Sequence, residues 1–443
     1  MDATYMDSLK AFVDRQQEIF NNGINAGKFQ PWVFPRDFVS IPIIVIALLI
    51  KWPRDGPIKY LKHLLYFYSL YSNIYAIFHC RSLAILGGYG IGLIFSWFSI
   101  WSAALLLFND VQENYKRIER SFEPLEAERQ DLPNGKNENH MGSVRLRSPQ
   151  NQRTSTLELS SDGKIGYNPK VVRRFRWQGY PESLGHRFAW VFDLLISQRG
   201  PHWNWRAKDF PALPKNIQLQ LDHGERAKPS DDLLWEEDTR AHLKASFCRM
   251  LVYYLCLDFL KVIVIGDPYF LGYLDSPPPS FFDFCGILAP IVAHIYRLIL
   301  TTAAVFFSVV FPASLITTIF LAISLTPLRF WTRIPFEASF LYPPYFGNIL
   351  TSTLDGGLIG LWGTCWHKQF RAGFLAPGNW IKPVSVSTPT GGEQRSSMFW
   401  CLHVIISFTL SGIVHAAGSY TQVTPTNPSG QFLFFISQMF RNG

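Results

Sequence analysis

The longest apolar stretch of the chain is "FFDFCGILAPIVAHIYRLILTTAAVFFSVVFPASLITTIFLAISL", residues 281–325, and it decides the fold class. An apolar helix of about 20 residues crosses the roughly 30 Å hydrocarbon layer of a bilayer. Pro290 and Pro312, with the polar interruption at His294 and Arg297, leave two arrangements open: one long broken helix, or two spans. Both arrangements predict a membrane protein.

The composition agrees with a membrane class. Of the 443 residues, 48% are apolar, 16% are aromatic and only 17% are charged. Segments with few or no charges also occur at residues 38–50, 64–78, 84–108, 247–265 and 398–417, and residues 432–440 begin another. The sequence therefore predicts an all-α, polytopic membrane protein with about seven to nine transmembrane helices around a central chamber. The lipid bilayer is its first expected partner.

Charge along the chain predicts four segments. The loop after the first span is basic and is expected in the cytosol by the positive-inside rule; its charges are Lys51, Arg54, Lys59 and Lys62 against Asp55 alone. We divide the chain into a three-span region (1–108), a polar cytosolic loop (109–170), an amphipathic segment with interfacial helices (171–245) and a membrane-embedded region (246–443) whose final span is incomplete. Residues 130–166 are expected to be disordered. The tryptophans after residue 171 are expected at the membrane interface; they are Trp177, Trp190, Trp203 and Trp205.

His415 lies inside the apolar segment "SFTLSGIVHAAGSY", residues 407–420. An ionisable group within a membrane span is a functional hypothesis by default, because it is costly there. Ser411 stands one helical turn before it, so its hydroxyl can bond one ring nitrogen and leave the other free to take a proton. The alternative is a structural histidine bonded between helices, with Gly412 and Gly418 permitting close packing.

A second candidate site is "LWGTCWHKQFR", residues 361–371. It combines Trp362, Trp366 and His367 with two cations, Lys368 and Arg371. Lysine and arginine suit the phosphates of a nucleotide-type carrier. The alternative is an interfacial anchor that positions a helix end.

Other chemistry is mostly excluded. The six cysteines form no C-x-x-C pair, so neither a metal site nor a disulfide framework is expected. No G-x-S-x-G elbow, P-loop or H-E-x-x-H motif occurs. The net charge of +8 is spread over the loops, which argues against a nucleic-acid partner.

Three segments resemble the fungal wax-synthase-like proteins of the membrane-bound O-acyltransferase superfamily. "LWGTCWHKQFR" resembles their W-G-x-x-W-H-x-x-F-R signature, "RFAWVFDLLISQRGPHWNW" (187–205) their aspartate and arginine-glycine segment, and "SGIVHAA" (411–417) their intramembrane histidine helix. The resemblance implies a multi-pass enzyme of the endoplasmic reticulum that moves an acyl group from coenzyme A to a hydroxyl. The superfamily's invariant histidine maps onto His415, and its second position, Asn or His, maps onto His367. Thr364 and Cys365 replace the usual arginine pair after W-G.

The resemblance and the residues together give one hypothesis of mechanism. His415 acts as the general base on a small hydrophobic alcohol, a terpenoid or meroterpenoid of fungal secondary metabolism, and His367 orients the thioester. Acyl-CoA, expected to be acetyl-CoA, is a co-substrate rather than a bound cofactor; Trp362, Trp366, Lys368, Arg371 and Ser411 would contact the substrates. Two alternatives stay open: a membrane terpenoid cyclase or isomerase on the same scaffold, and a non-catalytic lipid transporter or scaffold. The sequence does not specify the alcohol, the acyl chain or the oligomeric state.

Overall fold

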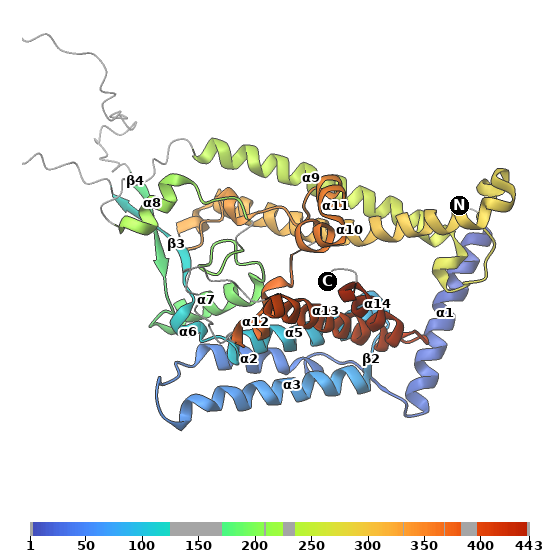
Figure 1. The fold of residues 1–443 in the computed structure, drawn as a ribbon, viewed down its shortest axis with the longest axis horizontal. Helices are drawn as coiled ribbons and strands as arrows, with labels where there is room; N and C mark the ends of the chain where they lie inside the picture. Colours follow the sequence, from blue (N-terminus) through green and yellow to red (C-terminus); the bar gives the residue numbers. More distant parts are fainter. Residues whose placement is uncertain are drawn as a thin grey trace, which may run out of the picture.

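The computed structural model describes residues 3–124, 171–207, 210–224, 235–330, 332–366, 368–381 and 397–440. Within these residues the protein is mostly helical, as the sequence predicts. Figure 1 shows two layers of helices, with a small β-sheet near one end.

The lower layer in Figure 1 combines helices from the N-terminal and the C-terminal parts of the sequence. Its helices are α2 (Ser40–Leu49), α3 (Leu61–His79), α5 (Tyr89–Leu106), α13 (Ser397–Tyr420) and α14 (Pro428–Phe440). α5 is central, because it packs against both α3 and α13, and α14 packs against α13. A helix with neighbours on several sides is apolar all round rather than along one stripe. That explains why most of α5 is buried, including Phe95, Trp97 and Trp101.

The upper layer is the long pair α9 (Trp235–Gly266) and α10 (Ala289–Ser324), which lie side by side. α10 is one helix of 36 residues that continues through Pro312. The 3-10 helix Ser280–Leu288 precedes it and is broken at Gly286, so residues 281–325 form one long broken helix. The polar interruption is satisfied by a buried ion pair. Arg297 donates to both carboxylate oxygens of Asp267, at 2.8 and 2.9 Å, and such a bidentate pair lets the helix keep its guanidinium in an apolar setting.

The remaining α-helices connect and flank the layers. They are α1 (Ala3–Asn25), α4 (Ala84–Gly87), α6 (Val111–Asn114), α7 (Leu184–Ile196), α8 (Lys215–His223), α11 (Ile349–Gly360) and α12 (Arg371–Trp380). Figure 1 places α1 across one end of the layers, and α7 and α8 near the other.

Two small sheets correct the all-α prediction. The first is parallel and pairs β1 (Gln30–Pro31) with β2 (Cys80–Arg81). The second is antiparallel and pairs β3 (Arg117–Pro124) with β4 (Val171–Gln178), in register from Arg117↔Gln178 to Pro124↔Val171.

The β3–β4 pair was missed because its strands are rich in charge and far apart in the chain. Charges that look solvated in the sequence are paired across the strands, as where Arg176 lies 2.6 Å from buried Glu119. Such cross-strand pairs stabilise a sheet. Residues 130–166, which were expected to be disordered, lie outside the described residues.

Tryptophans of the segment 171–245 form part of the protein core. Trp190 and Trp203 are completely buried, and their ring centroids lie 5.0 Å apart in an edge-to-face arrangement. Trp205 packs against Trp101 of α5, with 6.0 Å between centroids. The prediction that Trp190 and Trp203 lie at the membrane interface is therefore wrong, because other parts of this chain cover them.

Three helices of the described residues are long and apolar enough to cross a membrane: Tyr89–Leu106, Ser280–Ser324 and Phe399–Tyr420. α2 is a shorter apolar helix. These helices support a multi-pass membrane protein, although they are fewer than the seven to nine crossings expected from the sequence. α9 is long, but its first turns carry the charged sequence "WEEDTRAHLK".

Candidate functional site

His415 lies half-buried on α13, between side chains from two other helices. A hydrogen bond of 2.8 Å joins its Nδ1 atom to the hydroxyl of Tyr89, the first residue of α5. On its other side, the imidazole stacks on the ring of Phe435 of α14, with centroids 4.5 Å apart and an interplanar angle of 14°. The ring is therefore held in place, and the hydroxyl that bonds it is that of Tyr89 rather than that of Ser411.

Glycines set the distance between α5 and α13. A Cβ atom at Gly92 would lie 2.0 Å from the carbonyl oxygen of Ala417, and one at Gly418 would lie 2.9 Å from the Tyr89 ring. Gly412 faces α14 in the same way, with a Cβ contact of 2.9 Å. Small residues let membrane helices approach closely, and here this approach brings the Tyr89 hydroxyl to the imidazole.

The segment 361–371 connects α11 to α12 through an irregular turn. Leu361–Cys365 form one π-helical turn, a feature often found at functional sites, and Trp366 leaves it in an extended conformation. The indole nitrogen of Trp362 donates to Gln438 of α14 at 3.4 Å. His367, the second predicted catalytic residue, lies outside the described residues.

A row of aromatic rings links this segment to His415. Trp366 contacts Trp362 with centroids 5.5 Å apart, and Trp362 contacts Phe435 at 6.2 Å. Phe435 is the ring on which His415 stacks. The predicted residues Trp362, Trp366 and His415 thus belong to one packed cluster, although they come from separate parts of the sequence.

Lys368 and Arg371 belong to a cationic region that also includes Arg199. Burial is the main cause that lowers the pKa of Lys368, and the positive charges of Arg371 and Arg199 lower it further. Three cations that repel one another in this way favour an anionic ligand. Arg371 is exposed, whereas only 8% of Arg199 is.

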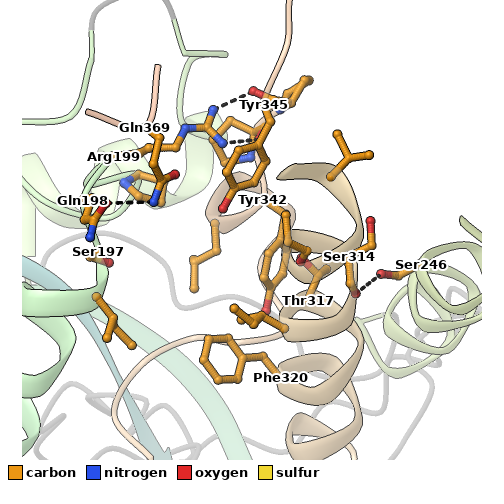
Figure 2. A pocket seen from close by; sticks show the side chains of 18 of the residues that line it. Ser197, Gln198, Arg199, Ser246, Ser314, Thr317, Phe320, Tyr342, Tyr345 and Gln369 are labelled. Carbon is orange, nitrogen blue, oxygen red and sulfur yellow. Dashed lines mark hydrogen bonds between the residues drawn. The ribbon is translucent and has the colours of Figure 1, made fainter. Parts of the chain in front are cut away.

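A cavity with a volume of about 580 Å³ lies beside this cationic region. Figure 2 shows Arg199, Tyr345 and Gln369 on one side of it, and Thr317 and Phe320 of α10 on the other. This cavity is not lined by His415 or by the other predicted site residues that the structure describes. Phe346 connects the two, because it lines the cavity and contacts Trp366 with centroids 5.7 Å apart. This cavity is therefore separate from His415, whose ring stacks on Phe435.

The segment 187–205 supplies one wall of this cavity and also ties it to β3. Asp193 accepts a hydrogen bond from Arg117 at 3.1 Å and bonds His202 Nε2 at 2.8 Å, and all three side chains are buried. Burial raises the pKa of Asp193, but the charge and hydrogen bonds of His202 and Arg117 outweigh it and hold this pKa below its usual value. Arg199 donates to the carbonyl oxygens of Pro343 and Pro344, which fixes the loop before α11.

Two residues at the site were missed in the sequence. Tyr89 is 326 positions from His415, and no local pattern marks a tyrosine at a helix start as its partner. Arg199 lies in the segment 187–205, which resembles the wax-synthase-like proteins, so the resemblance could have identified it as a site residue.

Comparison with known proteins fits this arrangement. Residues 342–437 match the profile of the membrane bound O-acyl transferase family, and this range holds both the segment 361–371 and His415. The O-mevalon transferase macI of Penicillium terrestre is 27% identical over 272 residues, which make up 58% of this chain and 52% of that protein. This chain therefore spans about half the length of the curated relative that it matches. No solved structure matches it significantly. With a histidine held inside an apolar helix, residues 342–437 are thus similar to the membrane bound O-acyl transferase family.

Proposed function

We propose that the protein moves an acyl group from acyl-CoA to the hydroxyl of a hydrophobic alcohol. The observation that carries the proposal is the family match over residues 342–437, which encloses an intramembrane histidine and a cationic segment. His415 is the general base of this proposal, and Tyr89 sets the orientation of its ring.

The tautomer of His415 decides which nitrogen reacts. If Nδ1 carries the proton and donates it to the Tyr89 oxygen, Nε2 keeps a free lone pair. Nε2 then accepts the proton of the alcohol as the alcohol oxygen attacks the thioester carbonyl. The carbon–sulfur bond breaks, and the coenzyme A thiolate leaves and takes up the proton. General-base assistance of this kind contributes about 10²–10⁴-fold to the rate.

The acyl carrier is assigned to two residues of the cationic region, Lys368 and Arg371. In this proposal Lys368 and Arg371 hold carrier phosphates, because both are strong partners for phosphate oxygens. Trp362 and Trp366 flank the path of the acyl chain, and Ser411 lies one turn from His415 on the same helix. By its place in the family pattern, His367 orients the thioester or donates to the developing oxyanion.

The packed rings impose a condition on this mechanism. Phe435 lies against His415, and Trp362 lies against Phe435. An alcohol therefore reaches Nε2 only if one of these side chains rotates, or if it enters from the lipid side of α13. The large-to-small variant Phe435→Ala separates the two routes, because it speeds transfer only where the ring blocks entry.

The finer assignments extend the same proposal. An acetyl donor, a terpenoid or meroterpenoid alcohol, a role in fungal secondary metabolism and a location in the endoplasmic reticulum all follow from the resemblance in the sequence. A relative whose name describes transfer of a mevalon group supports a transferase of this general class. The four-segment division of the chain and about seven to nine crossings around a chamber belong to the same proposal.

The test is product analysis in microsomes. Membranes that contain the full chain are given a panel of acyl-CoA donors and a panel of terpenoid alcohols, and the products are identified by mass spectrometry. We expect an ester from at least one pair, and its loss in His415→Ala with the protein still abundant; His367→Ala is expected to impair turnover. The matched control is His403→Ala, which removes a histidine from the same helix, and it should leave the ester in place.

Three outcomes would contradict the proposal. Full transfer by His415→Ala would exclude the base assignment. Conversion of the alcohol without acyl-CoA would favour the cyclase or isomerase alternative. Binding without any conversion, with both histidines tolerating alanine, would favour the transporter or scaffold.

A further inference from the structure

The cavity of about 580 Å³ has a buried positive charge on its wall. Its charged lining residues are Asp193, Arg199 and Arg249. Asp193 is already paired with Arg117 at 3.1 Å, and Arg249 is exposed. Arg199, by contrast, is only 8% exposed. Water shields its positive charge little, so this charge favours an anion in the cavity.

Arg199 has no acidic partner within the described part of the chain. Its guanidinium donates to the carbonyl oxygens of Pro343 and Pro344, and it lies 4.3 Å from the ring centroid of Tyr345. Carbonyl oxygens and an aromatic face compensate a cation only partly. The guanidinium has five N–H donors, and its buried Nε has no partner among the described atoms. Donors therefore remain for an anion with two oxygens.

The opposite wall of the cavity is mostly apolar. Phe306, Val310 and Phe320 of α10 line it, with Phe336 and Leu341 from the loop that follows. Its volume of about 580 Å³ lies within the usual 300–1,000 Å³ range of small-molecule sites. Figure 2 shows the labelled polar side chains Arg199 and Gln369 at the end of the cavity away from Phe320. The site is therefore polar and cationic at one end and apolar along its length.

We propose that this cavity binds an amphipathic carboxylic acid, whose carboxylate pairs with Arg199 and whose apolar body lies along α10. This inference rests on the proposed function in one respect: the bound acid is also the acceptor of the acyl group. The acceptor would then carry both a carboxylate and a hydroxyl, as a hydroxy acid does. His202 also lines this cavity, and its buried Nδ1 has no partner among the described atoms.

The test is a binding measurement that needs no transfer. The full chain in lipid nanodiscs is titrated with tritiated abietic acid and, separately, with its tritiated methyl ester, which has the same ring body and no charge. We expect the acid to bind about tenfold more tightly or better, since hydrogen bonds to charged groups are worth that much. Arg199→Gln should abolish the preference. The matched control is Arg187→Gln, because Arg187 also donates to backbone carbonyls but does not line the cavity.

Equal binding of acid and ester by the unaltered protein would overturn the inference, and this result does not depend on how a variant folds. Retention of the preference in Arg199→Gln would overturn it as well. If coenzyme A displaces the acid competitively, and Arg199→Gln loses coenzyme A binding too, the anion at Arg199 is a carrier phosphate and the carboxylate assignment fails. Arg199-dependent acid binding by a protein that makes no ester would leave this inference standing and remove the proposed function.

Discussion

Replacing Tyr89 by phenylalanine tests whether the hydrogen bond to His415 serves catalysis. The bond joins the Tyr89 hydroxyl to Nδ1 at 2.8 Å, and it is the contact that can hold the proton on Nδ1 and the lone pair on Nε2. Tyr89→Phe removes only the hydroxyl. The phenylalanine ring still fills the space against Gly418, so the packing of α5 on α13 is retained.

The expected loss follows from the strength of one hydrogen bond. Such a bond contributes roughly 0.5–1.5 kcal/mol, and each 1.36 kcal/mol on the barrier is tenfold in rate. We therefore expect kcat to fall roughly 2- to 13-fold. KM for the acyl carrier should stay unchanged, because Tyr89 bonds His415 and is not one of the residues assigned to the carrier. Initial rates of ester formation in microsomes, corrected for protein amount, give both constants.

The matched control is Tyr66→Phe, which removes another buried tyrosine hydroxyl, on α3. It should leave kcat within about twofold of the unaltered protein, as expected for a change without a specific mechanism. An unchanged kcat in Tyr89→Phe would refute the positioning role. An equal fall in both variants would show that the loss comes from general destabilisation.

Three further predictions concern the carrier, the helix crossing and acid stability. Arg371→Ala should raise KM for the acyl carrier with little change in kcat, since it removes a phosphate partner; an unchanged KM would exclude that role. Gly92→Ala should lower stability by about 1–3 kcal/mol, measured by thermal unfolding in detergent, because its Cβ would lie 2.0 Å from the Ala417 carbonyl; unaltered unfolding would mean that the helices separate at no cost. Burial raises the pKa of Asp193, but His202 contributes to holding it below its ordinary value of 3.8. A lowered pKa gives stability that is present above pH 3.8 and is lost as pH falls through the folded value. Asp193→Asn should therefore flatten the fall in unfolding temperature below that pH; an unchanged acid profile would exclude Asp193 as its source.

Helix positions were predictable wherever an apolar run is flanked by polar residues. The run 398–417 corresponds to α13 (Ser397–Tyr420), and the run 432–440 lies within α14 (Pro428–Phe440). Hydrophobicity is enough here because the lipid and the neighbouring helices both favour apolar side chains.

The β3–β4 sheet and the buried tryptophans were not predictable in the same way. Both depend on partners far away in the chain: Ile118 pairs with Trp177 across the sheet, and Trp203 packs on Tyr115. A tryptophan among basic residues suits a membrane interface and a protein core equally well in composition. Tertiary packing decides between the two, and composition carries no information about it.

The ionisable groups in the apolar helices show how the structure separates a structural role from a chemical one. Arg297 on α10 is paired with Asp267 through two hydrogen bonds, so its charge is neutralised within the protein and it is held for structure. His294 on the same helix bonds the carbonyl of Pro290 in its own helix, at 2.7 Å. His415 has neither kind of partner at Nδ1. It is bonded to a neutral hydroxyl from another helix, which can fix the ring without using Nε2. All three residues are candidates for function because they lie in apolar segments. The neutral hydroxyl partner of His415 is what favours this residue for proton transfer.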